Sequence, residues 1–69
     1  MRYTRAMRMA ELGANIIIAE DSRIQFSDAL SLVQIVTQNG GSITVEKAYH
    51  HTEIEQMVAI AANKITIKV

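Results

Sequence analysis

The feature that most constrains the fold of this chain is a helix-then-strand unit that occurs three times. Gly13 ends the first helical pattern and Gly40-Gly41 ends the second, because glycine readily takes the left-handed conformation that follows a helix. Asn63 ends the third pattern and is the next best residue for that position. A β-prone run follows each stop, at 16–20, 42–46 and 64–69. The helical patterns have the spacing of a buried stripe and consist of Tyr3, Ala6, Met7 and Ala10; of Ala29, Leu32, Val33 and Val36; and of Ile54, Met57, Val58 and Ala61.

These units predict a single α/β domain over residues 1–69, with units at about 3–20, 27–47 and 52–69. A helix that joins two strands favours parallel strands and a right-handed connection, so strands in chain order place every helix on one face of the sheet. The second and third runs alternate β-branched and polar residues, which is typical of a strand with one buried face. We therefore expect a two-layer, solenoid-like domain, with a three-stranded, mainly parallel sheet and helices packed on one face.

The open face of this sheet is the first candidate for function. The expected register places Ile16, Ile43 and Ile65 against the helices. Ile17 then lies on the open face, where the other two strands carry threonine, and the final strand has a bare edge. Exposed apolar residues and unpaired edges are places where another chain can dock. We expect self-association through this surface, with Ile17, Thr44, Thr66 and Lys68 as its residues.

The composition favours a protein partner. A chain of 69 residues buries only about 60% of its unfolded surface, so small domains often need disulfides, a metal or oligomerisation for stability. Cysteine is absent, which excludes disulfides and thiolate zinc sites. Seven basic and seven acidic residues give zero net charge, which removes the main argument for nucleic acid as the partner. The expected partner is another copy of the chain or another protein.

Signatures of catalysis are absent from the sequence. There is no cysteine nucleophile and no G-x-S-x-G turn, and the carboxylates are scattered. Loops that cradle phosphates place glycines between a strand and the following helix. The three glycines of this chain lie instead between a helix and the following strand. We expect a protein that is not an enzyme and that holds no cofactor.

A small-ligand or metal site is an alternative at the carboxyl ends of the strands, where parallel α/β sheets usually bind ligands. Loops 21–26 and 47–51 lie at that rim, and plain solvated histidines are the simpler interpretation of the second loop. No metal ligands are assigned, because the histidines and nearby glutamates do not form a two-turn metal-binding pattern. The residues expected at a ligand rim are Arg23, Lys47, Tyr49, His50 and His51.

Another alternative is an anionic partner for the first helix, where Arg2, Arg5 and Arg8 recur every three residues. This strip predicts a regulatory or nucleic-acid-associated role, unless it is only the solvated face of an amphipathic helix. Arg8 and Glu11 interrupt the apolar stretch that a signal peptide needs, and no run approaches the roughly 20 apolar residues of a membrane span. We therefore expect a cytoplasmic protein without a membrane partner.

The starts of two helices are predicted from capping residues. Thr52 and Glu55 have the spacing of a capping box, in which each side chain accepts a hydrogen bond from a free backbone N–H of the first turn. Ser27, followed by the acidic Asp28, is typical of an N-cap at the start of the second helix.

Overall fold

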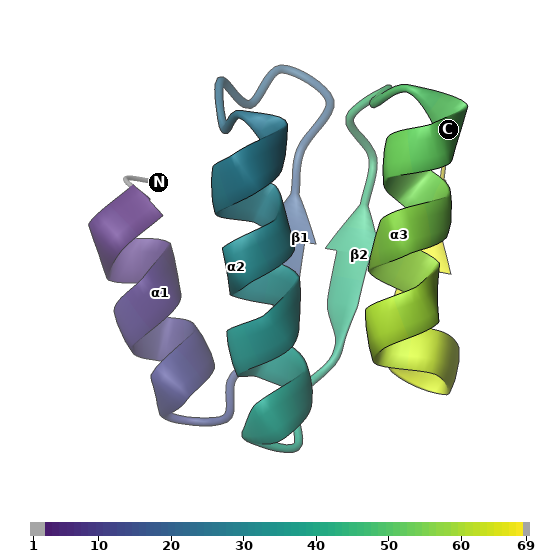
Figure 1. Ribbon diagram of the computed structural model, residues 1–69. Coiled ribbons are helices and arrows are strands. Elements are labelled where there is room, and N and C mark those ends of the chain that lie inside the picture. Colours follow the sequence, from purple (N-terminus) through teal and green to yellow (C-terminus); the bar gives the residue numbers. More distant parts are fainter. Residues whose placement is uncertain (1–2, 69) are drawn as a thin grey trace.

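The computed structural model describes residues 3–68, in which helices and strands alternate. Each strand is three residues long and each is preceded by a helix. Figure 1 shows the three helices side by side, with the strands behind them. The elements are α1 (Tyr3–Glu11), β1 (Ile16–Ile18), α2 (Phe26–Gln38), β2 (Ile43–Val45), α3 (His51–Ala61), a 3-10 turn η1 (Ala62–Lys64) and β3 (Ile65–Ile67).

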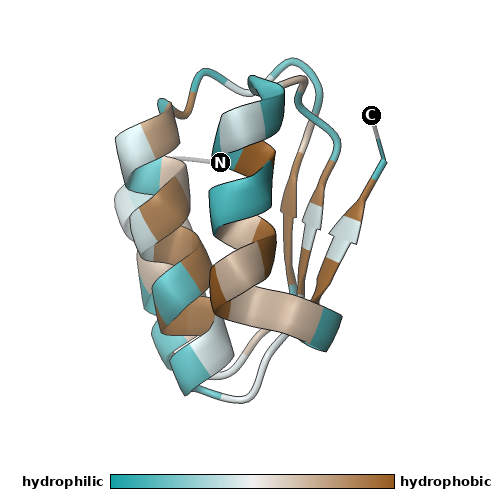
Figure 2. Cartoon of the chain, turned by 45° about the vertical axis from the view of Figure 1, so that its right-hand side comes forward, coloured by the Kyte–Doolittle hydropathy of each residue, from teal (hydrophilic) through white to brown (hydrophobic). Residues whose placement is uncertain are grey.

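The three strands form one parallel sheet in the order β1-β2-β3. Ile16 pairs with Ile43, and Ile43 pairs with Ile65, which is the predicted register. Figure 2 shows the helices on one side of this sheet, and no helix or strand of residues 3–68 lies on the other side. The predicted two-layer α/β fold with helices on one face is therefore confirmed. The strands are shorter than the β-prone runs, because the chain leaves the sheet after Ile18 and Val45 to enter the loops before α2 and α3.

The core lies between the two layers and is entirely apolar among the described residues. The central helix α2 contributes four buried side chains, whereas α1 and α3 each contribute two. This difference arises because α2 has a helix on either side of it, as Figure 1 shows. The buried residues are Ala6, Ala10, Ile16, Ile18, Ala29, Leu32, Val33, Val36, Ile43, Val45, Met57 and Ala61.

The glycines end the first two helices as predicted. Gly13 has a φ of 88° and Gly40 has a φ of 78°, so both are left-handed. After α2, the N–H of Gly41 donates to the carbonyl of Val36 at 3.0 Å, and the N–H of Gly40 donates to the carbonyl of Thr37 at 3.4 Å. These two bonds form a Schellman motif, which satisfies carbonyls that the helix itself leaves without a partner.

The third helix ends differently from the prediction for Asn63. Ala62 takes the positive φ of 50°, and Asn63 lies inside the 3-10 turn η1. The N–H of Ala62 donates to the carbonyl of Val58, which closes the last turn of α3 one residue before Asn63. The prediction was therefore wrong by one residue, because η1 is inserted between the helix and β3.

The predicted N-cap of the second helix is also wrong. Helix α2 begins at Phe26, so Ser27 lies within its first turn, and the N-cap residue is Gln25. The side chain of Gln25 makes no capping hydrogen bond. Phe26 is half-buried and packs against the core. A capping side chain contributes about 1 kcal/mol, which the burial of an aromatic ring at the start of a helix can outweigh.

Candidate interaction surface

The open face of the sheet carries an exposed isoleucine in its middle row. The Ile17 residue is 65% exposed, whereas Ile16 and Ile18 on either side are 5% and 1% exposed. Ile17 pairs across the sheet with Thr44, which pairs with Thr66. Three of the four residues predicted for self-association therefore form one row, and Lys68 follows at the end of β3.

The two outer strands have backbone groups that point away from the sheet. The N–H of Ile16 donates to Ser42 O at 2.9 Å, and Ile18 O accepts from the N–H of Glu46 at 2.8 Å. Successive residues of a parallel strand direct these groups to opposite sides. The N–H and carbonyl of Ile17 therefore point to the free edge of β1.

The same reasoning applies to β3 at the other end of the sheet. The N–H of Lys68 donates to the carbonyl of Val45 at 2.9 Å, so residues 66 and 68 face β2. The backbone groups of Ile65 and Ile67 therefore point to the free edge of β3. Neither edge is paired within the described residues, and unpaired edges of this kind are templates for pairing with another chain.

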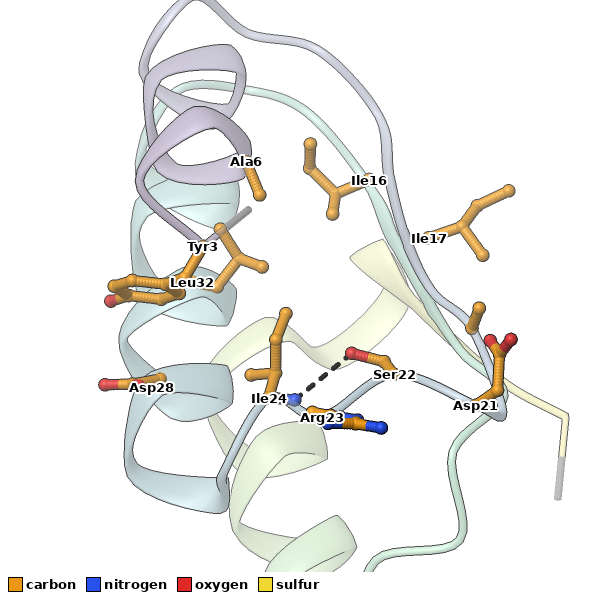
Figure 3. A pocket seen from close by; sticks show the side chains of 11 residues that line it. Tyr3, Ala6, Ile16, Ile17, Asp21, Ser22, Arg23, Ile24, Asp28 and Leu32 are labelled. Carbon is orange, nitrogen blue, oxygen red and sulfur yellow. Dashed lines mark hydrogen bonds between the residues drawn. The ribbon is translucent and has the colours of Figure 1, made fainter. Parts of the chain in front are cut away.

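A cleft of about 510 Å³ lies along the free edge of β1. Helix α1 contributes Tyr3 and Ala6 to its walls, α2 contributes Leu32, and β1 contributes Ile16. Figure 3 shows Ala6, Ile16 and Leu32 directed toward a common space. Ile17 also lines the cleft, although its side chain is directed to the other side of the strand from that of Ile16. Loop residues Asp21–Ile24 and helix residue Asp28 add polar groups to one end. We call this space the β1-edge cleft.

The β1-edge cleft was not predicted from the sequence, although the chain order contains a signal for it. Helices α2 and α3 each connect two strands of the sheet. Helix α1 precedes β1 and connects no pair of strands among the described residues. Figure 1 accordingly shows α1 beside α2, with no strand behind it. The cleft is the space below this overhanging helix.

Tyr49, one of the predicted ligand-rim residues, ties the two rim loops together. Its hydroxyl donates to the carbonyl of Ile24 at 2.7 Å. Burial, and secondly the negative charge of Glu53, raise the pKa of Tyr49 above its ordinary value of 10.0. The Nζ atom of Lys47 lies 5.8 Å from the centre of the Tyr49 ring. Tyr49 therefore has a structural role in holding the loop before α3 against the loop before α2.

The capping box of α3 is formed by His50 and Glu53, not by Thr52 and Glu55. The backbone N–H of His50 donates to Glu53 Oε1 at 3.0 Å, and the N–H of Thr52 donates to His50 Nδ1 at 3.4 Å. The prediction was wrong because α3 begins at His51, which places Thr52 and Glu55 inside the helix.

The two rim histidines are exposed, and their rings stack at 4.6 Å between centres with an interplanar angle of 29°. Residues 3–68 contain no group of three His, Cys, Asp or Glu side chains that could hold a metal ion. Arg23 lines the β1-edge cleft, whereas neither histidine does. Of the five predicted rim residues, Arg23 alone lines this cleft.

Two of the three predicted arginines can be placed on α1, and Arg2 lies outside the described residues. Arg5 and Arg8 are both exposed. Arg8 Nη1 lies 3.8 Å from Glu11 Oε1, with side chains 69% and 50% exposed. An ion pair this exposed contributes little to stability, but it lowers the net positive charge of the strip.

Comparison with known proteins identifies no relative: no family model, no curated protein and no solved structure matches this chain. No helix within residues 3–68 has both the length and the apolar character that crossing a membrane requires.

Proposed function

We propose that this chain is a small, non-enzymatic protein-interaction module that associates with copies of itself through the edges and open face of its sheet. The observation that carries the proposal is the free edge of β1, where unpaired backbone groups adjoin the apolar wall of the β1-edge cleft. A strand that pairs with this edge gains main-chain hydrogen bonds and buries apolar surface in the same event. Burial of further surface is the contribution that a small domain lacks.

Ile17 adds a contribution on the open face. Complete burial of an isoleucine side chain stabilises an interface by about 1.5–3 kcal/mol, and Ile17 has most of its surface available for this. The flanking Thr44 and Thr66 are short and uncharged, so a second chain can approach the row without burying a charge. The same features give no support to catalysis, which needs positioned titratable or nucleophilic groups.

Sedimentation velocity over a range of concentrations tests this proposal. We expect a dimer or larger species at micromolar concentration, and we expect Ile17→Lys to shift the equilibrium toward monomer. Leu12→Lys is the matched control, because Leu12 is also 65% exposed but follows α1 and belongs to no strand. A protein that stays monomeric at every concentration and still unfolds cooperatively at high temperature would contradict the proposal.

The two other hypotheses from the sequence stay predictions, and no contact favours either. An anionic partner at Arg5 and Arg8 predicts binding that weakens steeply with salt. A ligand at the Tyr49–His51 loop predicts perturbed histidine resonances when that ligand, or zinc, is added. In the structure Arg8 lies beside Glu11, and His50 caps α3.

A further inference from the structure

We infer that copies of this chain join head to tail, with β3 of one copy pairing in parallel with the free edge of β1 in the next, beneath α1. The inference rests on the proposed self-association and specifies its geometry. The partner is a second copy of this chain, because the two ends of the sheet are complementary to each other. At the β1 end of the sheet, α1 has no strand of residues 3–68 beneath it (Figure 1). At the other end, β3 has no helix of these residues beyond it.

Each junction between neighbouring strands of the sheet is covered by one helix. Helix α2 connects the strands of the β1–β2 junction, and α3 connects those of the β2–β3 junction. Helix α1 overhangs the free edge of β1 and would cover a junction with an added strand (Figure 1). Head-to-tail addition places β3 there, and within residues 3–68 no second helix accompanies β3 on its free side.

The symmetric alternatives fail this test. Pairing of two β1 edges about a two-fold axis perpendicular to the sheet would make the two strands antiparallel and would place two α1 helices over one junction, where each internal junction has one helix. Pairing of two β3 edges would leave a junction with no helix over it, so the isoleucines on the helix side would remain open to solvent. Only the β3-to-β1 junction receives one helix, as the two internal junctions do.

The two free edges also match each other in their hydrogen-bonding pattern. In the β1–β2 ladder, residues 16 and 18 of β1 direct their backbone N–H and carbonyl groups toward β2. Residues 42, 44 and 46 on the β2 side direct theirs toward β1. The free edge of β3 presents residues 65 and 67, and the free edge of β1 presents residues 15, 17 and 19. The free edge of β3 therefore has the pattern of β1 in this ladder, and the free edge of β1 has the pattern of β2. An added β3 therefore repeats the internal register, with Ile65 opposite Ile16 and Ile67 opposite Ile18.

The side chains that this register brings together are complementary as well. Ile65 and Ile67 are only half-buried, whereas their counterparts in β1 and β2 are at most 5% exposed. In the added position both point to the helix side, into the β1-edge cleft below Ala6. Lys68 then lies opposite residue 19, next to the exposed acids Glu20 and Asp21. Apolar filling and opposite charge both favour the head-to-tail arrangement.

A head-to-tail contact leaves one β1 edge and one β3 edge free on every assembly. Addition can therefore continue until the rotation between copies closes a ring, or it forms an open filament. This distinguishes the inference from the general proposal of self-association, which a closed two-fold dimer would also satisfy.

Two variants that each block one edge test the inference. Ile17→Pro removes an N–H that faces the free edge of β1, and Ile67→Pro removes one that faces the free edge of β3, so neither substitution deletes an internal sheet hydrogen bond. We expect each variant alone to be monomeric. An equimolar mixture should form a one-to-one dimer that does not grow, because each variant supplies the edge that the other lacks. Circular dichroism establishes that both variants are folded.

If each variant still dimerises alone, the head-to-tail inference is overturned while the proposed self-association stands. If the unmodified chain is monomeric at every concentration, both the inference and the proposed self-association fail.

Cysteine cross-linking gives a second measurement that does not depend on proline being tolerated. The chain has no cysteine, and the head-to-tail register places Ile17 of one copy beside Thr66 of the copy whose β3 pairs with it. An Ile17→Cys chain and a Thr66→Cys chain should cross-link to each other on oxidation at least tenfold more than either does to itself. Equal self-linking would refute the register.

Discussion

The adjacent glycines after α2 provide a quantitative test of the structure, because the two are required for different physical reasons. Gly40 has a φ of 78°, and a Cβ atom added to it would meet nothing within 4 Å. Gly41 is buried, and a Cβ atom added to it would lie 2.6 Å from the carbonyl oxygen of Ala14. Gly40→Ala therefore measures backbone strain alone, and Gly41→Ala measures a collision between two loops.

The expected magnitudes follow from these two environments. An L-residue in the left-handed conformation costs roughly 1–2 kcal/mol, so we expect Gly40→Ala to lower the free energy of unfolding by about 1 kcal/mol. Overpacking costs typically about 1–3 kcal/mol, and Gly41→Ala belongs at the upper end because the atom it meets is backbone. Domains of this size have about 3–10 kcal/mol in total. Gly41→Ala should therefore remove a large part of the stability.

Urea denaturation followed by far-ultraviolet circular dichroism measures both effects, provided that the slope with urea is the same in all variants. Gly40→Asn is the control, since asparagine tolerates the left-handed conformation and should lose less stability than alanine does. The reasoning is refuted if Gly41→Ala unfolds within about 0.5 kcal/mol of the unmodified protein, the range of an ordinary surface substitution. It is equally refuted if Gly40→Ala is the more damaging of the two.

Two further predictions concern the rim loop and the end of α3. The pKa of Tyr49 is raised above 10.0 in the folded state, so this tyrosine ionises at lower pH in the unfolded chain. The free energy of unfolding should therefore fall as the pH rises above 10.0, until the pH exceeds the pKa of Tyr49 in the folded state. Absorbance titration in a Tyr3→Phe background should give a higher midpoint for folded than for urea-unfolded protein, and equal midpoints would contradict the burial. Ala62→Gly should raise the free energy of unfolding by about 1 kcal/mol in the same urea assay, because glycine relieves the positive φ of 50°. Loss of stability in this variant would show that the conformation is not strained.

The sheet and its orientation could be predicted from the sequence because they follow from local patterns. The alternation in 43–45 and 65–67 determines which side chains face the helices, and parallel strands joined by right-handed connections leave one face open. Gly13 and Gly40 could be assigned to helix ends because few other residues take their conformation. In each case one strong physical preference acts at one position.

The helix starts could not be predicted as well, because capping preferences are weak. Ser27 and Thr52 are good capping residues, yet the helices begin at Phe26 and His51. A cap contributes about 1 kcal/mol, so tertiary packing can move a helix start by one or two residues. Histidine is not among the residues usually preferred at the N-cap, which is why the cap formed by His50 was not predicted.

Features of the candidate surface also differ in whether a local sequence pattern predicts them. Exposure of Ile17 could be predicted because it depends only on the period of a strand. The β1-edge cleft depends on where α1 lies relative to β1 and α2, and no pattern within a single element contains that information. The hydrogen bond from the Tyr49 hydroxyl to the carbonyl of Ile24 could not be predicted either, because it joins residues 25 positions apart in the chain.

The mismatch between helices and strand junctions connects the repeat to the proposed assembly. Within residues 3–68 there are three helices, but three strands in one sheet make only two junctions. One helix, α1, therefore covers a junction that these residues do not complete. An added strand must be parallel to β1, must present its backbone groups in the pattern of β3, and must carry apolar side chains toward Ala6 and Ile16. Because β3 itself meets all three requirements, the unit that builds the fold is also the unit by which one copy can extend the next.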